Sequence, residues 1–173
     1  MRLKYMLAIA FTIITAAHIV SAEDAPKPYV GSPEFEKLKT LAGTWTGTMT
    51  MGKDPMPITA QYRVISGGSA VEERLFADTP MEMVTIYHDE KGKLALTHYC
   101  MLCNRPAMQL VKSDAKSLSF DLKRDSGINV KKEKHMHSLT LTFDDADNIT
   151  ANWTLWEAGK PQPHNPFNLT RKK

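Results

Sequence analysis

The chain has 173 residues, of which 42% are hydrophobic and 24% charged, and its formal net charge is +3. This length suits one domain with a sizeable core, and the near balance of charge excludes a nucleic-acid binder with a concentrated basic face. Two cysteines are too few for a disulfide scaffold, so the fold must rest on a hydrophobic core.

Residues 1–22 have the pattern of a cleaved signal peptide. Arg2 and Lys4 precede an apolar run over 6–20, and the small residues Ser21 and Ala22 follow it. The run of about 15 residues is shorter than the roughly 20 needed to cross a bilayer, so we expect no stable membrane span, an uncleaved anchor being the alternative. Removal of 1–22 lowers the formal charge to +1. The sequence therefore predicts a periplasmic or secreted protein.

An extended leader and a short helix are expected next. Three prolines lie among polar residues over 23–33, so we interpret 23–32 as a leader. Ser32 and Pro33 are typical of a helix N-cap and first position, with an acidic residue following in the first turn. Phe35, Leu38 and Leu41 then recur at helical spacing. The pattern predicts one helix over 33–41.

The hydrophobic period then changes to two. Trp45, Gly47 and Met49 alternate with threonines over 44–51, which indicates a half-buried strand. Further alternating or apolar runs end at turn residues such as Gly67-Gly68, and they cover 57–66, 69–77, 81–88, 93–100, 107–112, 117–123, 135–143, 148–157 and 164–171. Strands joined by short turns without crossover helices predict an all-β domain over 33–173. We expect a single closed antiparallel meander β-barrel of about 8–10 strands with a short N-terminal helix.

Several segments carry a family resemblance. "FEKLKTLAGTWTGT" starts at Phe35 and resembles the opening signature of the calycin barrels, which include lipocalins, fatty-acid-binding proteins and nitrobindin-like domains. "YRVISGGSAVEERLF", "MEMVTIYHDEKGKLALTHYCMLCNRPAM" and "LTLTFDDADNITANWTLW" resemble the exported bacterial DUF1579-type proteins, which are grouped with lipocalin-like barrels. The resemblance covers 35–171. It implies that Trp45 closes one end of a barrel, and it implies no settled activity.

Alternation predicts which side chains point into the barrel. His98 shares a face with Leu94 and Leu96, and His137 shares a face with Leu139 and Leu141, which places His135 at the rim. A few polar groups inside an apolar pocket are typical of a binding site. We therefore expect an exported protein that holds a small, largely apolar molecule. The predicted ligand-binding residues are Trp45, Tyr62, Glu73, Leu96, His98, His137, Phe143 and Trp153.

Glu73 has two interpretations. If Val71 and Leu75 point inward, Glu73 does too, and a buried carboxylate must be paired or lose its charge. The alternative, which the sequence slightly favours, is an outer-face ion pair between Glu72 and Arg74.

Two alternative functions use the histidines. The first is metal or haem binding by His98, His135 and His137, perhaps with Cys100, because neutral imidazole is a common metal ligand. The second is a small enzyme with His98 as general base. Histidines that only bond a buried neighbour are a third interpretation. No cofactor can be named from the sequence.

Cys100 and Cys103 form a Cys-x-x-Cys motif after a strand, where a short disulfide is expected in an oxidising compartment. Copper binding with the soft ligands Met101 and Met108 is an alternative. The nitrobindin-like resemblance implies a haem-ligating histidine on the last strand. Phe167 or Asn168 occupies that place here, and His164 lies several residues earlier.

Overall fold

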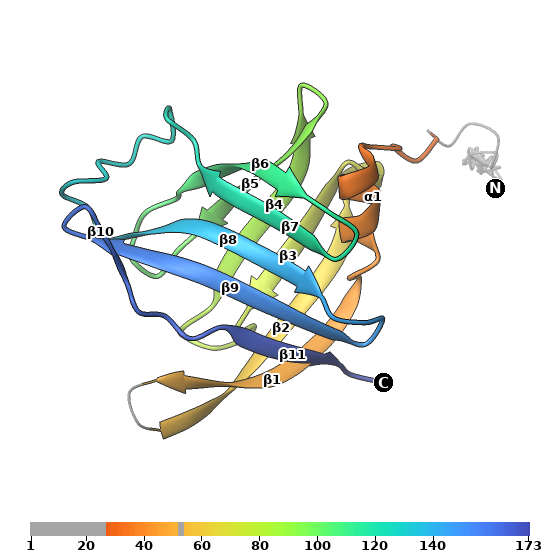
Figure 1. Cartoon of the computed structure of the whole chain (residues 1–173). Coiled ribbons are helices and arrows are strands. Elements are labelled where there is room, and N and C mark those ends of the chain that lie inside the picture. The colour runs from red at the N-terminus through yellow and green to blue at the C-terminus, as the bar shows by residue number, and fades with distance from the viewer. Residues whose placement is uncertain (1–26, 52–53) are drawn as a thin grey trace, which may run out of the picture.

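The computed structural model describes residues 27–51 and 54–173 (Figure 1). The predicted signal peptide, 1–22, and the first part of the predicted leader, 23–26, lie outside the described residues. Export of the protein therefore stays a prediction. No helix in the described part of the chain is long and apolar enough to cross a membrane.

Helix α1 (Pro33–Lys39) begins as the sequence predicts and ends two residues earlier. The Ser32 side chain accepts a hydrogen bond from the backbone N–H of Phe35 at 3.2 Å, so Ser32 is the N-cap. The Ser32 hydroxyl and backbone N–H both donate to the carboxylate of Asp89 on strand β4. The helix buries Phe35 and Leu38 against the sheet. These contacts fix α1 over one end of the barrel.

Nearly all the remaining described elements are strands, and most begin and end within three residues of their predicted positions. They are β1 (Gly43–Met51), β2 (Asp54–Ile65), β3 (Ala70–Leu75), β4 (Met83–Glu90), β5 (Lys93–Tyr99), β6 (Ala107–Ser113), β7 (Ser117–Leu122), β8 (His135–Phe143), β9 (Asn148–Glu157), β10 (Lys160–Gln162) and β11 (Phe167–Arg171). A 3-10 turn over Ser66–Gly68 joins β2 to β3, and both glycines there have positive φ, which glycine adopts at little cost.

The sheet closes into a barrel, which confirms the predicted fold class. Neighbouring strands pair antiparallel in chain order from β1 to β9, and β11 lies between β9 and β1 and completes the ring of ten strands. The short strand β10, which was not predicted, pairs only with the end of β9. Closure satisfies the backbone hydrogen bonds that open sheet edges would expose.

The seam between β1 and β11 depends on Gly47. A Cβ atom added to this residue would overlap the backbone carbonyl oxygen of Asn168 on β11. Only glycine therefore allows the two strands to approach this closely. Gly47 in the alternating pattern of β1 is therefore required for the pairing of β1 with β11, which closes the barrel.

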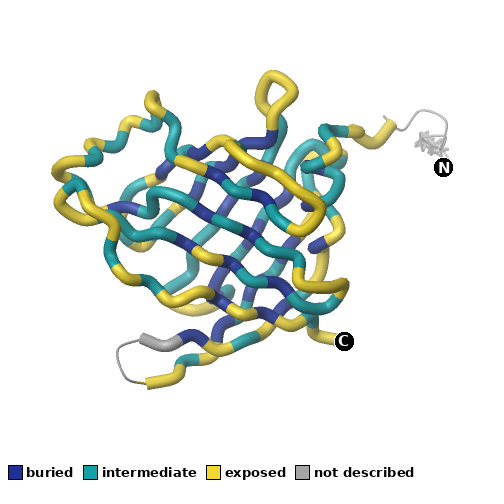
Figure 2. The backbone as a smooth tube through the Cα atoms, in the orientation of Figure 1, coloured by how far each residue is buried: buried dark blue, intermediate teal, exposed yellow. Residues whose placement is uncertain are grey.

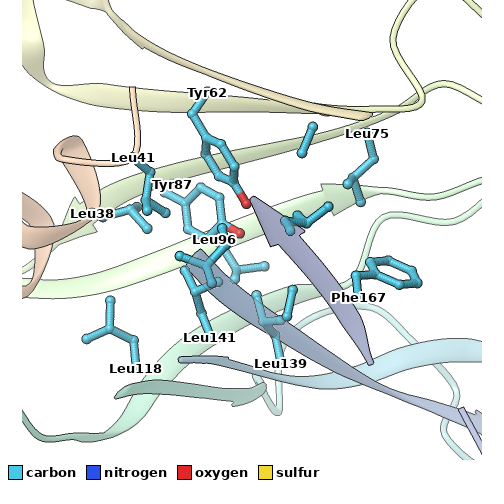
Figure 3. Close-up of a cluster of buried hydrophobic side chains, with 14 of the residues drawn as sticks. Leu38, Leu41, Tyr62, Leu75, Tyr87, Leu96, Leu118, Leu139, Leu141 and Phe167 are labelled. Carbon is cyan, nitrogen blue, oxygen red and sulfur yellow. The ribbon is translucent and has the colours of Figure 1, made fainter. Parts of the chain in front are cut away.

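Buried side chains from strands on different sides of the barrel meet in its interior (Figure 3). Buried positions alternate with more exposed ones along most strands (Figure 2), as a closed barrel with a packed inside requires. Large side chains that are almost fully buried include Trp45, Tyr62, Tyr87, Leu96, Met108, Phe120, Leu139 and Leu141. The core therefore lies inside the barrel and continues under α1.

The two ends of the barrel differ. At the α1 end, Arg171 donates hydrogen bonds to the carbonyl oxygens of Thr40 and Ala42, and its guanidinium lies 4.2 Å from the ring of Trp45. At the opposite end, several partly buried methionines pack against the core. We call this end the mouth, and its methionines are Met56, Met81, Met83 and Met136. Methionine is flexible and adapts to irregular shapes, so the mouth is the more adaptable end.

Candidate functional site

A polar cluster lies inside the apolar barrel. Glu73, Thr85 and His98 are each 1% exposed, although their side chains are polar. They occupy paired positions on β3, β4 and β5, since Glu73 pairs with Thr85 and Thr85 with His98. Residues opposite each other on neighbouring strands point to the same side of the sheet. The three side chains therefore meet on the inner face of the wall.

Hydroxyl groups surround the Glu73 carboxyl group. Tyr62 Oη donates to Oε1 at 2.7 Å and Tyr87 Oη donates to Oε2 at 2.8 Å (Figure 3 shows both tyrosines within the leucine cluster). The nearby Thr85 hydroxyl also acts to lower the pKa of this carboxyl group. Burial raises the pKa of Glu73, and these hydroxyls oppose that rise. Burial and the nearby Glu73 raise the pKa of both tyrosines well above its ordinary value, so they remain protonated donors.

His98 extends this cluster toward the middle of the barrel. Its Nδ1 lies 2.9 Å from Thr85 Oγ1, and its ring lies 4.6 Å from that of Trp153, measured between centroids. Trp153 is on β9, which is not a neighbour of β5, so this contact crosses the interior. Burial lowers the pKa of His98 to about 4, which keeps the imidazole neutral at neutral pH. We call the five residues Tyr62, Glu73, Thr85, Tyr87 and His98 the inner polar network.

The network leaves one polar atom available. Within the described part of the chain, Nε2 of His98 forms no hydrogen bond, whereas both carboxyl oxygens of Glu73 have partners. Nε2 of His98 is not one of the fully buried side-chain atoms without a partner, which are Asn104 Oδ1 and His164 Nδ1 among the described residues. A molecule that entered the barrel with a small polar group would find a partner at Nε2 of His98.

The structure places six of the eight predicted ligand-binding residues inside the barrel wall and buries them: Trp45, Tyr62, Glu73, Leu96, His98 and Trp153. Tyr62 contacts Glu73, and His98 contacts Trp153. Trp45 lies at the α1 end, where its Nε1 donates to the Leu41 carbonyl oxygen at 2.8 Å. Their roles in binding stay predictions.

Glu73 faces inward, which was the less favoured of its two interpretations. Its neighbours face outward, where Glu72 pairs with Arg63 and Arg74 pairs with Glu82. The expected ion pair between Glu72 and Arg74 is not formed, because each of these residues pairs with a residue outside β3.

Phe143 also lies apart from the network. It is at the end of β8 near α1, partly buried, and the Lys37 ammonium lies 4.4 Å from its ring centroid. Sequence reasoning missed Thr85 and Tyr87, which connect the network. Both alternate with outward residues on β4, but only the register with β3 shows that they face Glu73.

The predicted inward orientation of His137 is wrong. A β-bulge interrupts the pairing of β8 with β9, because Met136 pairs with Leu155 and Ser138 with Thr154. The extra residue shifts the alternation, so Met136 packs on the core. His137 instead stacks on Trp156 at 3.8 Å and lies 3.6 Å from the exposed carboxylate of Asp121.

The predicted metal-binding set is not assembled. His135 Nε2 lies 2.9 Å from His137 Nδ1, and the rings of both histidines contact Trp156. His98 instead contacts Thr85 and Trp153. Among the described residues, no group of three or more His, Cys, Asp or Glu side chains is placed to hold a metal ion. The bulge and the barrel wall separate residues that local alternation had placed on one face.

The predicted disulfide is not formed, since Cys100 and Cys103 are free thiols in this structure. They belong to a tight turn in which the Cys103 N–H donates to the Cys100 carbonyl oxygen at 3.0 Å. Cys103 has a φ of 59° and its thiol is directed to the Met101 carbonyl oxygen. Met101 is exposed and Met108 is fully buried, so the proposed copper ligands point to different environments.

The residues do not fit a haem held from the last strand. The inward residues of β11 are Phe167 and Leu169, whose buried hydrocarbon side chains cannot ligate iron. His164 precedes the strand and is half-buried, with its ring 5.6 Å from that of Phe167. The expectation taken from nitrobindin-like domains therefore has no counterpart on β11.

A groove of about 650 Å³ lies on the outer surface over β5, β6 and β7. Its lining includes Lys93, Gln109 and Asp121, and an ion pair between Lys123 and Glu90 lies across it. Because charged side chains dominate this groove, it does not suit a largely apolar molecule.

Comparison with solved structures supports the fold. The chain is similar to the crystal structure of Rv2717c from M. tuberculosis, with a TM-score of 0.51 and 13% sequence identity over 83% of this chain and 100% of the other. Neither family models nor curated protein sequences match this chain. At this identity the likeness shows the barrel fold alone, and the resemblance to DUF1579-type proteins stays a prediction.

Proposed function

We propose that the protein binds a small, largely apolar molecule inside the barrel and holds its polar group at His98 Nε2. The observation that carries the proposal is the inner polar network in an otherwise apolar interior, which ends at a nitrogen that has no hydrogen bond to any described residue. A filled hydrophobic core needs no such network, because burying polar groups lowers stability unless each is satisfied. A few directed polar atoms within apolar walls are what ligand pockets contain.

The surroundings of His98 suit a hydrocarbon body. Trp153 contacts the imidazole ring, and Leu96 and Met136 belong to the same core. Each buried methylene of a ligand contributes about 0.8 kcal/mol, from which association costs are subtracted. A chain of about ten carbons therefore contributes about 8 kcal/mol before the association costs are subtracted.

Binding requires buried side chains to move, because bulky side chains such as Tyr62, Leu96 and Trp153 occupy the barrel interior. The methionines of the mouth are only partly buried, and their unbranched side chains change rotamer readily. The α1 end is held by the hydrogen bonds of Ser32 and Arg171. We therefore expect the molecule to enter through the mouth.

Native mass spectrometry of protein purified from its host tests the proposal. We expect a co-purifying small molecule, and we expect the neutral fluorophore N-phenylnaphthylamine to bind the delipidated protein and brighten. The variant Trp153→Ala removes the ring that contacts His98, and it should alter fluorophore affinity. The variant Trp156→Ala, on the outer face, is the matched control. Unchanged fluorescence, together with no co-purifying molecule, would contradict the proposal.

Export is part of the same proposal. The pattern of residues 1–22 supports cleavage after Ala22 and delivery to the periplasm or the medium. Sequencing the N-terminus of protein from each cell fraction tests this step. The expected result is a mature chain that begins at Glu23, and a cytoplasmic chain that retains Arg2 and Lys4 would contradict it.

A further inference from the structure

We propose that His137 and Asp121 together bind a divalent transition-metal ion such as Zn²⁺ where β7 pairs with β8. The site lies apart from the inner polar network, so the proposal does not depend on binding of a molecule inside the barrel. It differs from the metal-binding set predicted from the sequence, because it includes Asp121 and leaves out His98. His135 is a positioning residue behind His137.

The β-bulge near the start of β8 brings the two side chains together. Asp121 pairs with Ser138 at the end of β7, and the bulge lies between Met136 and Ser138. His137 is the residue inserted there, and bulges commonly redirect a side chain next to a functional site. As a result, His137 Nε2 lies 3.6 Å from Asp121 Oδ1.

The separation of these two atoms suits a shared metal ion better than a hydrogen bond. N–H···O hydrogen bonds span about 2.7–3.2 Å between the heavy atoms, which is shorter than the 3.6 Å found here. Two atoms that each lie about 2.1 Å from one tetrahedral Zn²⁺ are about 3.4 Å apart. A small shift of either side chain therefore places both atoms on one ion.

A chain of hydrogen bonds leaves a lone pair on His137 Nε2. His135 Nδ1 lies 2.7 Å from the carbonyl oxygen of Glu133, and a carbonyl oxygen can only accept, so Nδ1 carries the proton of the neutral ring. His135 Nε2 then has a lone pair, and at 2.9 Å it accepts from His137 Nδ1. Neutral His137 has its only proton on Nδ1, and its Nε2 is available as a metal ligand.

Both proposed ligands are held by further contacts, as metal ligands in proteins usually are. His137 donates to His135, which is fully buried, and its ring stacks on Trp156 with 3.8 Å between centroids and 12° between planes. The Leu122 N–H donates to Asp121 Oδ1 at 3.1 Å. These contacts fix the two side chains before an ion arrives.

The exposure and chemistry of the site determine which ions it takes. The side chains of His137 and Asp121 are 19% and 53% exposed, so an ion can reach them and water can complete its coordination. One imidazole nitrogen with one carboxylate favours Zn²⁺, Ni²⁺ or Cu²⁺, whereas Mg²⁺ and Ca²⁺ prefer oxygen ligands. Structural zinc sites have four protein ligands, so we expect an exchangeable ion at this site.

Titration calorimetry of the full chain with Zn²⁺ at mildly alkaline pH tests the proposal. Free thiols also bind this ion, so the titrations use the Cys100→Ser and Cys103→Ser background. We expect one Zn²⁺ per chain and no binding of Mg²⁺. His137→Gln and Asp121→Asn should each weaken Zn²⁺ binding more than about tenfold, because even contacts behind a ligand contribute that much.

His88→Gln changes a histidine on β4 and is the matched control, which should bind Zn²⁺ as tightly as the parent protein. His135→Leu removes the acceptor behind His137 and should weaken binding about tenfold, whereas His135→Gln keeps an accepting oxygen and should restore part of the affinity. Zn²⁺ binding that is absent from the parent protein, or unchanged in both His137→Gln and Asp121→Asn, would overturn the proposal.

Long-range proton–nitrogen NMR of the labelled parent protein gives a test that needs no variant of the site. Without metal we expect His135 and His137 both to be protonated at Nδ1. Addition of Zn²⁺ should shift the Nε2 signal of His137 and leave the His98 signals in place. A proton on His137 Nε2 at mildly alkaline pH, or a Zn²⁺-induced shift confined to other histidines, would overturn the proposal.

Discussion

Acidification should destabilise the protein through His98. Its pKa falls from 6.5 in the unfolded chain to about 4 in the folded protein, because burial disfavours the charged ring. Between these two values the unfolded state binds a proton that the folded state does not, so stability is lost as pH falls through this window. A pKa shift of this size corresponds to a loss of unfolding free energy on the order of 3 kcal/mol once the pH lies below both pKa values.

Urea unfolding at a series of pH values measures the effect, with His98→Gln as the reference. Glu73 contributes with the opposite sign, because its raised pKa makes the folded state bind a proton more readily as pH falls. His137 and His164 have lowered pKa values and act in the same direction as His98. Glu73, His137 and His164 are present in both proteins. The difference between the pH dependence of stability in the wild type and in the variant therefore reports on His98. Equal acid sensitivity of the variant and the wild type would show that His98 does not cause the loss of stability at low pH.

Three further predictions concern the wall, the network and the turn. Gly47→Ala should cost about 3 kcal/mol in unfolding free energy, because the new methyl group overlaps the β11 backbone; a change below about 1 kcal/mol in urea unfolding would contradict the close approach. Tyr62→Phe should cost about 1–3 kcal/mol, because it leaves one oxygen of Glu73 without its donor, and thermal unfolding with no loss of stability would show that the bond does not matter. Thiol titration of the native protein should find Cys103 reacting faster than the half-buried Cys100, and an absence of reactive thiols would indicate a disulfide instead.

The fold could be predicted from the sequence because each strand separates an apolar interior from water. Trp45, Gly47 and Met49 alternate with threonines, and this two-residue period repeats through most of the wall. Turn residues such as Gly67 marked the ends of the strands. Strand β10 was missed because Gly159 and Pro161 are typical of a turn, yet Pro161 pairs with β9 on an edge position.

The site was only partly predictable because local periodicity gives orientation but not neighbours. The inward direction of His98 follows from its alternation with Leu96, and the structure agrees. The contact between Glu73 and the side chains of β4 depends on the register of two strands, which no local pattern states. A bulge leaves no mark in a regular hydrophobic period, and for this reason the orientation of His137 was wrong.

A crystal structure of the protein grown with decanol would show where a bound molecule lies. We expect electron density for the alcohol inside the barrel, with its oxygen within hydrogen-bond distance of His98 Nε2 and with displaced methionine side chains at the mouth. An interior still filled by its own side chains at saturating decanol, with the alcohol only on the outer surface, would contradict this expectation.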